Sequence, residues 1–320
     1  MAEKTNIKKV AAVGILVADV MAPITEMPGR GELSRVESIT AHNGGNAMTA
    51  ALNLCKMGVD SRMIGKVGDD IFGKFLVERL IAGGVSADGV KVDKEVQTSV
   101  SVVLLDKGER SFLHCVGANA TFCYDDVDFS VIEDSDLVFV TGSFLMDTFD
   151  GEQTVRFLKK CKEMGKTTLL DVCFDARGRW GEIINPALPY IDFFMPSIDE
   201  AKEIAKTNGT PDEIADVFCS LGAKNIVIKL GSRGSYLRLC GEKKGKTFPP
   251  VKVDRVVDTT GAGDSFCSGF IAAYARGLEP EECMKIANAV GALCVTEKGA
   301  TTGIKTFNET IKFLEEKQCL

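Results

Sequence analysis

The sequence has very little histidine and tryptophan, and its cysteines form no recognisable pair. Among 320 residues there are two histidines, His42 and His114, and one tryptophan. Two histidines are too few for a multi-histidine metal site, and they argue against a nucleophile activated by histidine. The eleven cysteines are odd in number and contain no C-x-x-C pair, so their spacing predicts neither a zinc site nor a disulfide framework. Cysteines without a pattern are typical of a reducing compartment, and we expect a cytoplasmic protein.

Long apolar runs and an excess of positive charge are absent too. No stretch reaches the roughly 18 consecutive apolar residues of a transmembrane helix. The apolar run at residues 10–18 follows several lysines, as in a signal peptide, but Asp19 ends it early, so we interpret it as a buried first strand. The 38 basic and 45 acidic side chains give a net charge of −7, which argues against general binding to nucleic-acid phosphates. Neither a membrane nor a nucleic acid is expected as a partner.

Apolar, strand-like segments alternate with helical segments along most of the chain. Strands are expected at residues 10–17, 62–65, 137–141, 168–172, 191–195 and 225–230, and helices at 47–57, 152–164, 263–275 and 280–295. Continuous apolar strands between helices are typical of a parallel sheet that helices cover on both faces. The sequence therefore predicts a doubly wound α/β fold with a mostly parallel sheet.

Two early segments interrupt this alternation. Residues 98–105 and 110–116 flank the turn Asp106-Lys107-Gly108-Glu109, which predicts a β-hairpin, and residues 20–42 look irregular. Near the other end, residues 235–239 and 252–257 suggest strands of a β-meander. We expect a single domain over residues 1–320, with a small β-sheet lid formed by about 15–42 and 98–118.

The strongest chemical signal is the run Asp258-Thr259-Thr260-Gly261-Ala262-Gly263-Asp264, where an extended segment meets a helix. Small residues at a helix N-terminus let backbone N–H groups converge on an anion, and the helix dipole adds to the attraction. Asp264 falls in the first turn, where a carboxylate could accept a proton from a hydroxyl. The alternative for the short motif alone is an aspartate that only complements the helix dipole.

Residues 258–270 resemble the second signature of the ribokinase-like (PfkB) carbohydrate kinase family. Further segments are similar to other parts of that family in the same order: residues 42–58 with Gly44-Gly45-Asn46-Ala47, residues 65–73, residues 229–234 and residues 295–300. The match extends over about residues 10–305. The resemblance implies a ribokinase-like fold and an ATP-dependent sugar kinase that uses Mg²⁺ and, as a monovalent cation, K⁺.

The resemblance also implies a role for each matching position. Asp264 would be the catalytic base, and the N–H groups of Gly261, Ala262 and Gly263 would form an anion hole. The sugar would be bound by Asp19, Gly44, Gly45 and Asn46, the nucleotide by Lys229, Gly231, Ser232, Gly234 and Asn288, magnesium by Glu200, and the monovalent cation by Asp258, Thr260, Cys294, Glu297 and Gly299.

Several positions depart from the family pattern. Val17 stands where the family often has an asparagine that binds sugar, and Thr49 replaces another asparagine. The family's Asn-x-x-Glu is Ser197-Ile198-Asp199-Glu200, so the glutamate is kept and the asparagine is lost. These changes mean that the substrate of ribokinase cannot be transferred to this chain.

One arginine-rich segment suggests how the substrate could differ. Arg177 and Arg179 follow the strand at 168–172, at the edge where ligands bind in open α/β sheets. Arg177 could bind a carboxylate or phosphate of the substrate, with Asp175 orienting one of the arginines; the alternative is that both are surface cations.

We therefore predict an ATP-dependent sugar kinase. A nucleoside kinase on the same scaffold and a non-catalytic sugar sensor remain the alternatives. Lid sheets in the resembling family commonly pair between subunits, and an exposed sheet needs a partner, so a homodimer through the lid is expected.

Overall fold

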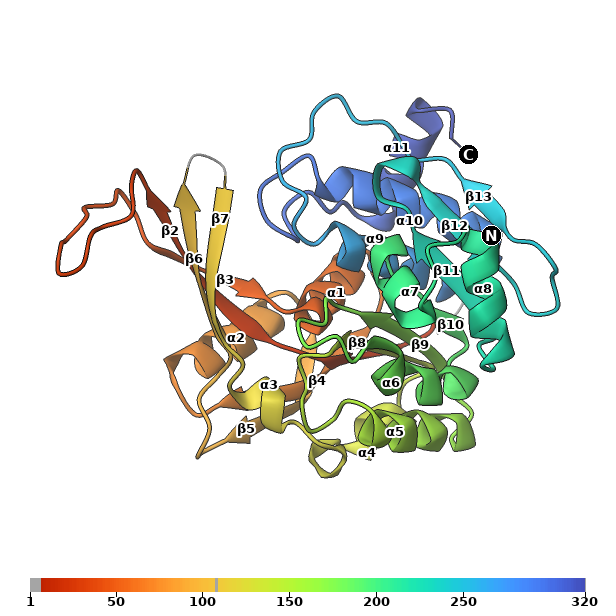
Figure 1. The fold of residues 1–320 in the computed structure, drawn as a ribbon, viewed down its shortest axis with the longest axis horizontal. Helices are drawn as coiled ribbons and strands as arrows, with labels where there is room; N and C mark the ends of the chain where they lie inside the picture. Colours follow the sequence, from red (N-terminus) through yellow and green to blue (C-terminus); the bar gives the residue numbers. More distant parts are fainter. Residues whose placement is uncertain (1–6, 107–108, 320) are drawn as a thin grey trace, which may run out of the picture.

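The computed structural model describes residues 7–106 and 109–319, which form a larger sheet between helices and a smaller sheet that projects from it (Figure 1). The larger sheet has the strand order β13-β12-β11-β10-β9-β8-β1-β4-β5. In chain order its strands are β1 (Val10–Gly14), β4 (Ser61–Gly68), β5 (Ser86–Asp93), β8 (Leu137–Ser143), β9 (Thr167–Val172), β10 (Phe193–Phe194), β11 (Asn225–Lys229), β12 (Ser235–Arg238) and β13 (Lys246–Phe248). Neighbours from β5 to β11 pair in parallel, and β12 and β13 extend one edge antiparallel. The predicted doubly wound, mostly parallel sheet is confirmed.

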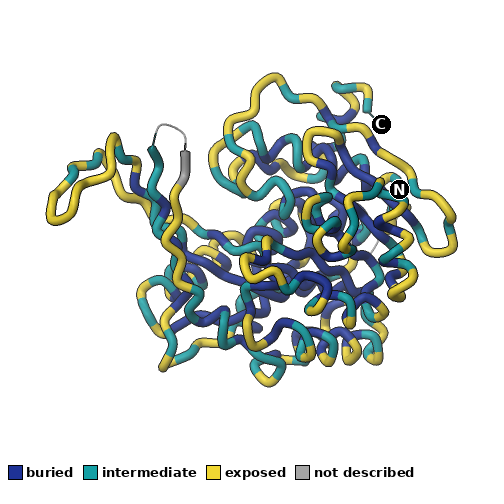
Figure 2. Tube along the Cα trace, in the orientation of Figure 1, coloured by how far each residue is buried: buried dark blue, intermediate teal, exposed yellow. Residues whose placement is uncertain are grey.

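Helices cover both faces of this sheet. They are α1 (Asn46–Lys56), α2 (Ile71–Ala82), α3 (Ala118–Thr121), α4 (Phe129–Glu133), α5 (Glu152–Glu163), α6 (Trp180–Ile184), α7 (Ile198–Ala205), α8 (Pro211–Ser220), α9 (Ala262–Tyr274), α10 (Pro280–Cys294) and α11 (Phe307–Glu316). Strand residues alternate between two cores because successive side chains point to opposite faces. In β8, Val138 and Val140 pack with residues of α4 to α8, whereas Leu137 and Phe139 pack with residues of α1, α9, α10 and α11. Figure 2 shows these strands as the buried centre of the molecule.

The smaller sheet has the order β3-β2-β6-β7 and consists of β2 (Val17–Ile24), β3 (Thr40–Gly44), β6 (Val100–Asp106) and β7 (Glu109–Cys115). The predicted hairpin is confirmed as the antiparallel pair β6 and β7, while residues 107 and 108 of its predicted turn lie outside the described residues. The expected strand at 10–17 is wrong in one respect, because the chain leaves the larger sheet after Gly14 and enters the smaller sheet at Val17. The segment expected to be irregular, 20–42, begins and ends in the strands β2 and β3.

Other differences lie near the sheet edges. The strand expected at 252–257 is absent, and β13 lies at 246–248 instead. Pro249 and Pro250 end β13, since proline has no N–H for the ladder, and Val256 and Val257 are exposed. The strand β5 and the helices α8 and α11 were not expected from the sequence. No helix in the described part of the chain is long and apolar enough to span a membrane.

Candidate functional site

A cavity of about 590 Å³ opens at the carboxyl ends of the central strands. Its walls come from the ends of β9 and β11, from the starts of α7 and α9, and from the first residue of α1. They include Asn46, residues 171–174, residues 197–200, residues 229–233, Thr259 and residues 261–264. The carboxyl edge of a parallel sheet is where open α/β proteins bind ligands, because loops from several strands meet there. The cavity therefore brings together segments that are far apart in the sequence.

The start of α9 forms one wall. Gly261 is its N-cap residue and has a φ of 73°. A side chain at this position would place its Cβ 2.2 Å from the Cβ of Ala300, so glycine is required by conformation and by space. The hydrogen bonds of the helix begin with the Ser265 N–H, which donates to the Gly261 carbonyl at 2.8 Å. Before it, the Ala262 N–H donates to the Thr259 carbonyl at 3.2 Å. An anion bound here would accept hydrogen bonds from the Ala262 N–H and from other N–H groups of the first turn.

Asp264 lies in the first turn of α9 and is half-buried on the cavity wall. Its Oδ1 accepts a hydrogen bond from Nδ2 of Asn46 at 2.8 Å. Burial raises its pKa to about 7, and the negative charges of Asp171 and Glu200 act in the same direction, while Asn46 and Lys229 oppose them. A carboxyl group that titrates near neutral pH is suited to accept and return a proton.

Asp171 and Lys229 form a buried ion pair that also lines the cavity. Nζ of Lys229 lies 2.6 and 2.7 Å from the two carboxylate oxygens of Asp171. The two residues come from β9 and β11, which flank the two-residue strand β10. The sequence indicates Lys229 through its resemblance, but it does not indicate its partner Asp171. A weak signal exists, because a charged residue inside the apolar strand at 167–172 must be paired if it is buried.

Glu200 and Ser197 cap the start of α7. The Ser197 N–H donates to Oε2 of Glu200 at 2.7 Å, and the Glu200 N–H donates to Oγ of Ser197 at 3.3 Å. Burial raises the pKa of Glu200, Asp171 adds to this effect, and Lys229 opposes it. Ser197 thus has a structural role as a helix cap, and the carboxylate of Glu200 lines the cavity at the position where magnesium is expected.

The residues expected around the nucleotide divide into two groups. Gly231 and Ser232 line the cavity in the turn between β11 and β12. Gly234 follows with a φ of 90°, and a Cβ there would lie 2.1 Å from the Phe248 carbonyl oxygen. Asn288, on α10, donates from Nδ2 to the Pro249 carbonyl at 3.0 Å. Gly234 and Asn288 therefore hold the loops next to the cavity and are not part of its wall.

The residues expected to bind the sugar meet between the smaller sheet and α1. Strands β2 and β3 are antiparallel neighbours with Val17 opposite Gly44. A Cβ on Gly44 would lie 2.1 Å from Oδ2 of Asp19, so the carboxylate packs directly on the glycine backbone. Gly45 then turns into α1 with a φ of 88° and is followed by Asn46, which contacts Asp264. The residues expected to bind the sugar are thus adjacent in space to Asp264, the expected base.

The residues expected around a monovalent cation lie in the loop before α9, at the last residue of α10 and in the turn that follows α10. The carboxylate of Asp258 accepts the N–H groups of Thr260 and Gly299, each at 2.9 Å. The Cys294 thiol donates to the Thr260 carbonyl at 3.4 Å. Glu297 is exposed in the turn that follows α10. The structure brings these five residues to one region next to Gly261.

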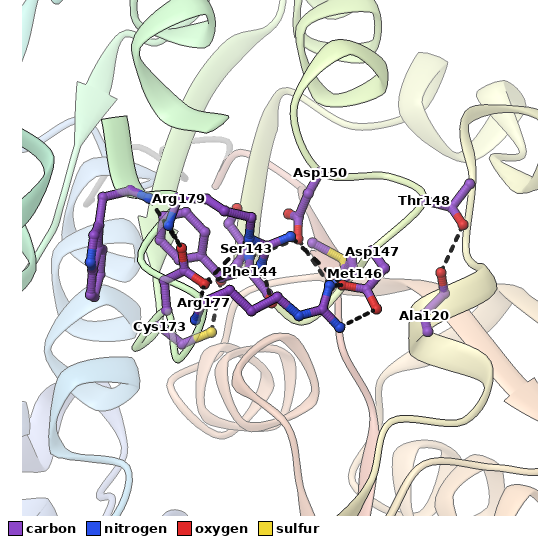
Figure 3. Close-up of polar contacts among 12 residues, drawn as sticks. Ala120, Ser143, Phe144, Met146, Asp147, Thr148, Asp150, Cys173, Arg177 and Arg179 are labelled. Atoms are coloured by element: carbon purple, nitrogen blue, oxygen red, sulfur yellow. Dashed lines mark hydrogen bonds and ion pairs between the residues drawn. The ribbon is translucent and has the colours of Figure 1, made fainter. Parts of the chain in front are cut away.

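Arg177 lies apart from this cavity. Its guanidinium makes two hydrogen bonds to the carboxylate of Asp147, at 2.9 and 3.1 Å, and its side chain is 61% exposed (Figure 3). Arg179 binds Asp175 and the Phe144 carbonyl. Arg177 is not on the cavity wall, so the structure does not bring it together with the other predicted site residues. Its charge is balanced by an acidic residue that the sequence did not indicate as a partner.

The loop that carries Asp147 is itself fixed by hydrogen bonds with its neighbours. Oδ2 of Asp150 accepts the N–H groups of Phe144 and Met146 at 2.8 and 3.2 Å, and Thr148 bonds the Ala120 carbonyl (Figure 3). Burial raises the pKa of Asp150 to about 7. The ion pair between Asp147 and Arg177 thus connects an ordered loop after β8 to the loop after β9.

The fold is a doubly wound α/β sheet with a cavity at its carboxyl edge, and comparison with known proteins identifies the class as a phosphotransferase. The family model described as pfkB family carbohydrate kinase matches residues 7–306. The chain belongs to the ribokinase-like pfkB family of carbohydrate kinases, enzymes that phosphorylate a hydroxyl group of a carbohydrate.

Individual relatives and solved structures support this assignment. The chain is 29% identical to a ribokinase of Arabidopsis thaliana over 316 residues, and this alignment covers 95% of this chain and 80% of that protein. It is 28% identical over 307 residues to a 2-dehydro-3-deoxygluconokinase of Bacillus subtilis, covering 90% and 91% of the two chains. The structure of Arabidopsis thaliana ribokinase complexed with ribose and ATP aligns with a TM-score of 0.84 at 28% identity, over 96% of this chain and 99% of that one. The predicted ribokinase-like fold and enzyme class are confirmed.

Proposed function

We propose that the protein transfers the γ-phosphoryl group of ATP to a hydroxyl group of a sugar, with Asp264 as the catalytic base. The observation that carries this proposal is the position of Asp264, whose carboxylate lies in the first turn of α9, inside the cavity and in contact with Asn46. A base at this point faces both the residues expected to bind the sugar and the helix N-terminus expected to bind the phosphoryl group.

Each part of the cavity has a task in this reaction. Asp19 and Asn46 would hold and orient the acceptor hydroxyl, and Asp264 would take its proton as the oxygen attacks phosphorus. N–H groups of Gly261, Ala262 and Gly263 would stabilise the negative charge on the phosphoryl oxygens. Asp264 then carries the proton at Oδ1 or Oδ2 until solvent removes it. The smaller sheet would act as a lid that keeps water away from the acceptor.

ATP and Mg²⁺ fit the chemistry of the residues present. Mg²⁺ is usually held by one or two carboxylates, by waters and by substrate phosphates, and the wall contributes the carboxylate of Glu200 for this purpose. When bound, the ion would neutralise charge on the ATP phosphates. Gly231 and Ser232 would contact the nucleotide along the cavity wall. Gly234 and Asn288 would hold the adjacent loops in place.

We also propose a monovalent cation, K⁺, behind the anion hole. The carboxylate of Asp258 and the carbonyl groups of Thr260, Cys294, Glu297 and Gly299 would be its ligands. The contacts between Asp258, Thr260 and Gly299 support this idea, since they link the two loops directly beside Gly261. The ion would fix the geometry of the anion hole without touching the substrate.

A homodimer through the smaller sheet is proposed as the assembly. Phe112 and Leu113 of β7 are 60% and 68% exposed, and Ile39 next to β3 is 66% exposed. Exposed apolar side chains on a sheet that projects from the body favour burial against a second copy. Light scattering during size-exclusion chromatography should give twice the chain mass, and a monomer at micromolar concentration would contradict the dimer.

The function is tested by ADP release with ATP, Mg²⁺ and K⁺ over panels of neutral sugars, sugar acids, sugar phosphates and nucleosides. We expect a sugar or sugar derivative to give the highest kcat/KM, and Asp264→Asn to lower kcat by orders of magnitude with little effect on ATP binding. A preference for nucleosides would favour the alternative acceptor class. Near-normal turnover of Asp264→Asn would show that another group is the base.

A further inference from the structure

The ion pair of Lys229 and Asp171 occupies a particular place in the cavity. The side chains are 12% and 2% exposed, respectively, and both residues belong to the cavity wall. The side chain of Lys229 runs along the first turn of α9, since a Cβ on Gly263 would lie 3.5 Å from its Nζ. A buried cation therefore lies beside the helix N-terminus where an anion is expected.

The alternation of side chains along the strands explains how the pair forms. Leu169 of β9 and Val227 of β11 face the core that contains α9, so Asp171 and Lys229, two residues further along each strand, face the same way. Between them β10 spans Phe193–Phe194 only, and the two side chains meet across its end. Both charged residues therefore lie at the carboxyl ends of their strands, on the face of the sheet that α9 covers.

The surroundings keep Lys229 charged. Burial disfavours the ammonium ion, but the carboxylate of Asp171 favours it more strongly and Glu200 adds to this effect, so the pKa of Lys229 is raised. Among the described residues of the wall the other basic side chain is Arg233, which is exposed. Lys229 is thus the buried positive charge of the cavity.

We propose that Lys229 is a catalytic residue that contacts the phosphoryl group during its transfer, and that Asp171 is a positioning residue that holds the ammonium beside α9. This inference rests on the proposed function. In the step, a bond forms between the acceptor oxygen and phosphorus, the bond from phosphorus to the bridging oxygen of ADP breaks, and the acceptor proton goes to Asp264. Lys229 keeps its three protons and offsets negative charge on the phosphoryl oxygens.

A purely structural ion pair would behave differently on mutation. Removing one partner leaves a buried charge unpaired, so Lys229→Met and Asp171→Asn should each lower Tm. The double variant Asp171→Asn/Lys229→Met removes both charges and should recover most of that loss. We expect its kcat to stay about 100-fold or more below that of the wild type. Recovery of kcat together with Tm would overturn the proposal.

A second measurement does not depend on knowing the acceptor. Calorimetric titration with Mg²⁺ compares ADP with the non-hydrolysable analogue β,γ-imido-ATP, which carries a γ-phosphoryl group. We expect the wild type to prefer the analogue, and the double variant to lose that preference while its affinity for ADP changes less than about twofold. Lys224→Met is the matched control, because Lys224 pairs with Asp192 just before β11 and lies outside the cavity.

The possible outcomes are distinct. An unchanged preference for the analogue in the double variant would overturn the role of Lys229 but not the proposed function. A loss of this preference in Lys224→Met as well would do the same. No binding of either nucleotide to the wild type would overturn the proposed function and this inference with it. Loss of the preference in the double variant, with the control intact, would support the assignment. For Asp171→Asn alone, a lower kcat with unchanged affinity for ADP is expected of a positioning residue.

Discussion

Nδ2 of Asn46 donates a hydrogen bond to Oδ1 of Asp264 at 2.8 Å, which joins the first turn of α1 to the first turn of α9. The two residues are 218 positions apart in the sequence. Asn46 follows directly on the smaller sheet, and Asp264 follows directly on the predicted anion hole. This contact therefore links the expected sugar site directly to the expected phosphoryl site.

The first prediction concerns the pH dependence of turnover. The hydrogen bond from Asn46 stabilises the carboxylate and so opposes the rise in the pKa of Asp264, which is about 7. The base must be deprotonated, so kcat should rise with pH around 7. In Asn46→Ala the midpoint should move to higher pH, as measured by initial rates from pH 5.5 to 9. Asn43→Ala, on β3, is the control, and an unmoved midpoint in Asn46→Ala would show that the contact does not tune the base.

The second prediction concerns stability. The pKa of Asp264 is raised from its ordinary value of 3.8 to about 7 in the folded chain. Between these values the folded protein keeps a proton that the unfolded chain has lost, so the free energy of unfolding falls as pH rises from about 4 to about 7. Asp264→Asn removes this effect. Its Tm should exceed that of the wild type by a few degrees at pH 8, and the gain should vanish near pH 4. A Tm difference that is equal at both pH values would contradict this explanation.

A third prediction concerns Arg177. Its two hydrogen bonds to Asp147 are exposed, and exposed ion pairs contribute between zero and about 1 kcal/mol. Arg177→Ala should therefore change Tm by no more than a few degrees and leave the KM of the acceptor unchanged. Asp147→Ala should behave in the same way. A KM for an acidic sugar that rises tenfold in Arg177→Ala, and not in Asp147→Ala, would return Arg177 to the binding site as the sequence first suggested.

These cases indicate what a sequence can and cannot reveal about this site. The start of α9 was predictable, because Gly261 and Asp264 lie within one local motif whose conformation depends on neighbouring residues. The continuous apolar strands were predictable for the same reason, since burial on both faces is visible in each segment alone.

The remaining features depend on how the segments are arranged in space. The pair of Asp171 and Lys229 requires that β9 and β11 flank the short strand β10, which no local pattern contains. The partner of Arg177 was hidden in the same way, because Asp147 lies on a loop after a different strand. Residues 252–257 alternate like a strand, yet they pair with no strand in the part of the chain that the structure describes. Pairing across the sheet, rather than composition, decides these positions.

The last prediction separates the shape of the anion hole from the cost of backbone strain. Gly261 has a φ of 73°, and a Cβ there would lie 2.2 Å from the Cβ of Ala300. Gly277, after α9, has a φ of 81° with nothing within 4 Å of such a Cβ. Alanine should cost about 1 kcal/mol at either position through the backbone, but at Gly261 it must also displace the loop that carries Ala300.

Gly261→Ala should therefore lower Tm more than Gly277→Ala and reduce kcat at least tenfold, because the N–H groups at the start of α9 lose their alignment. Gly277→Ala should lose stability without losing kcat, as thermal unfolding and ADP release on the same samples would determine. Equal kcat in the two variants would mean that the backbone at Gly261 tolerates displacement, and that the phosphoryl group is stabilised by other groups of the cavity, with Lys229 the first to examine.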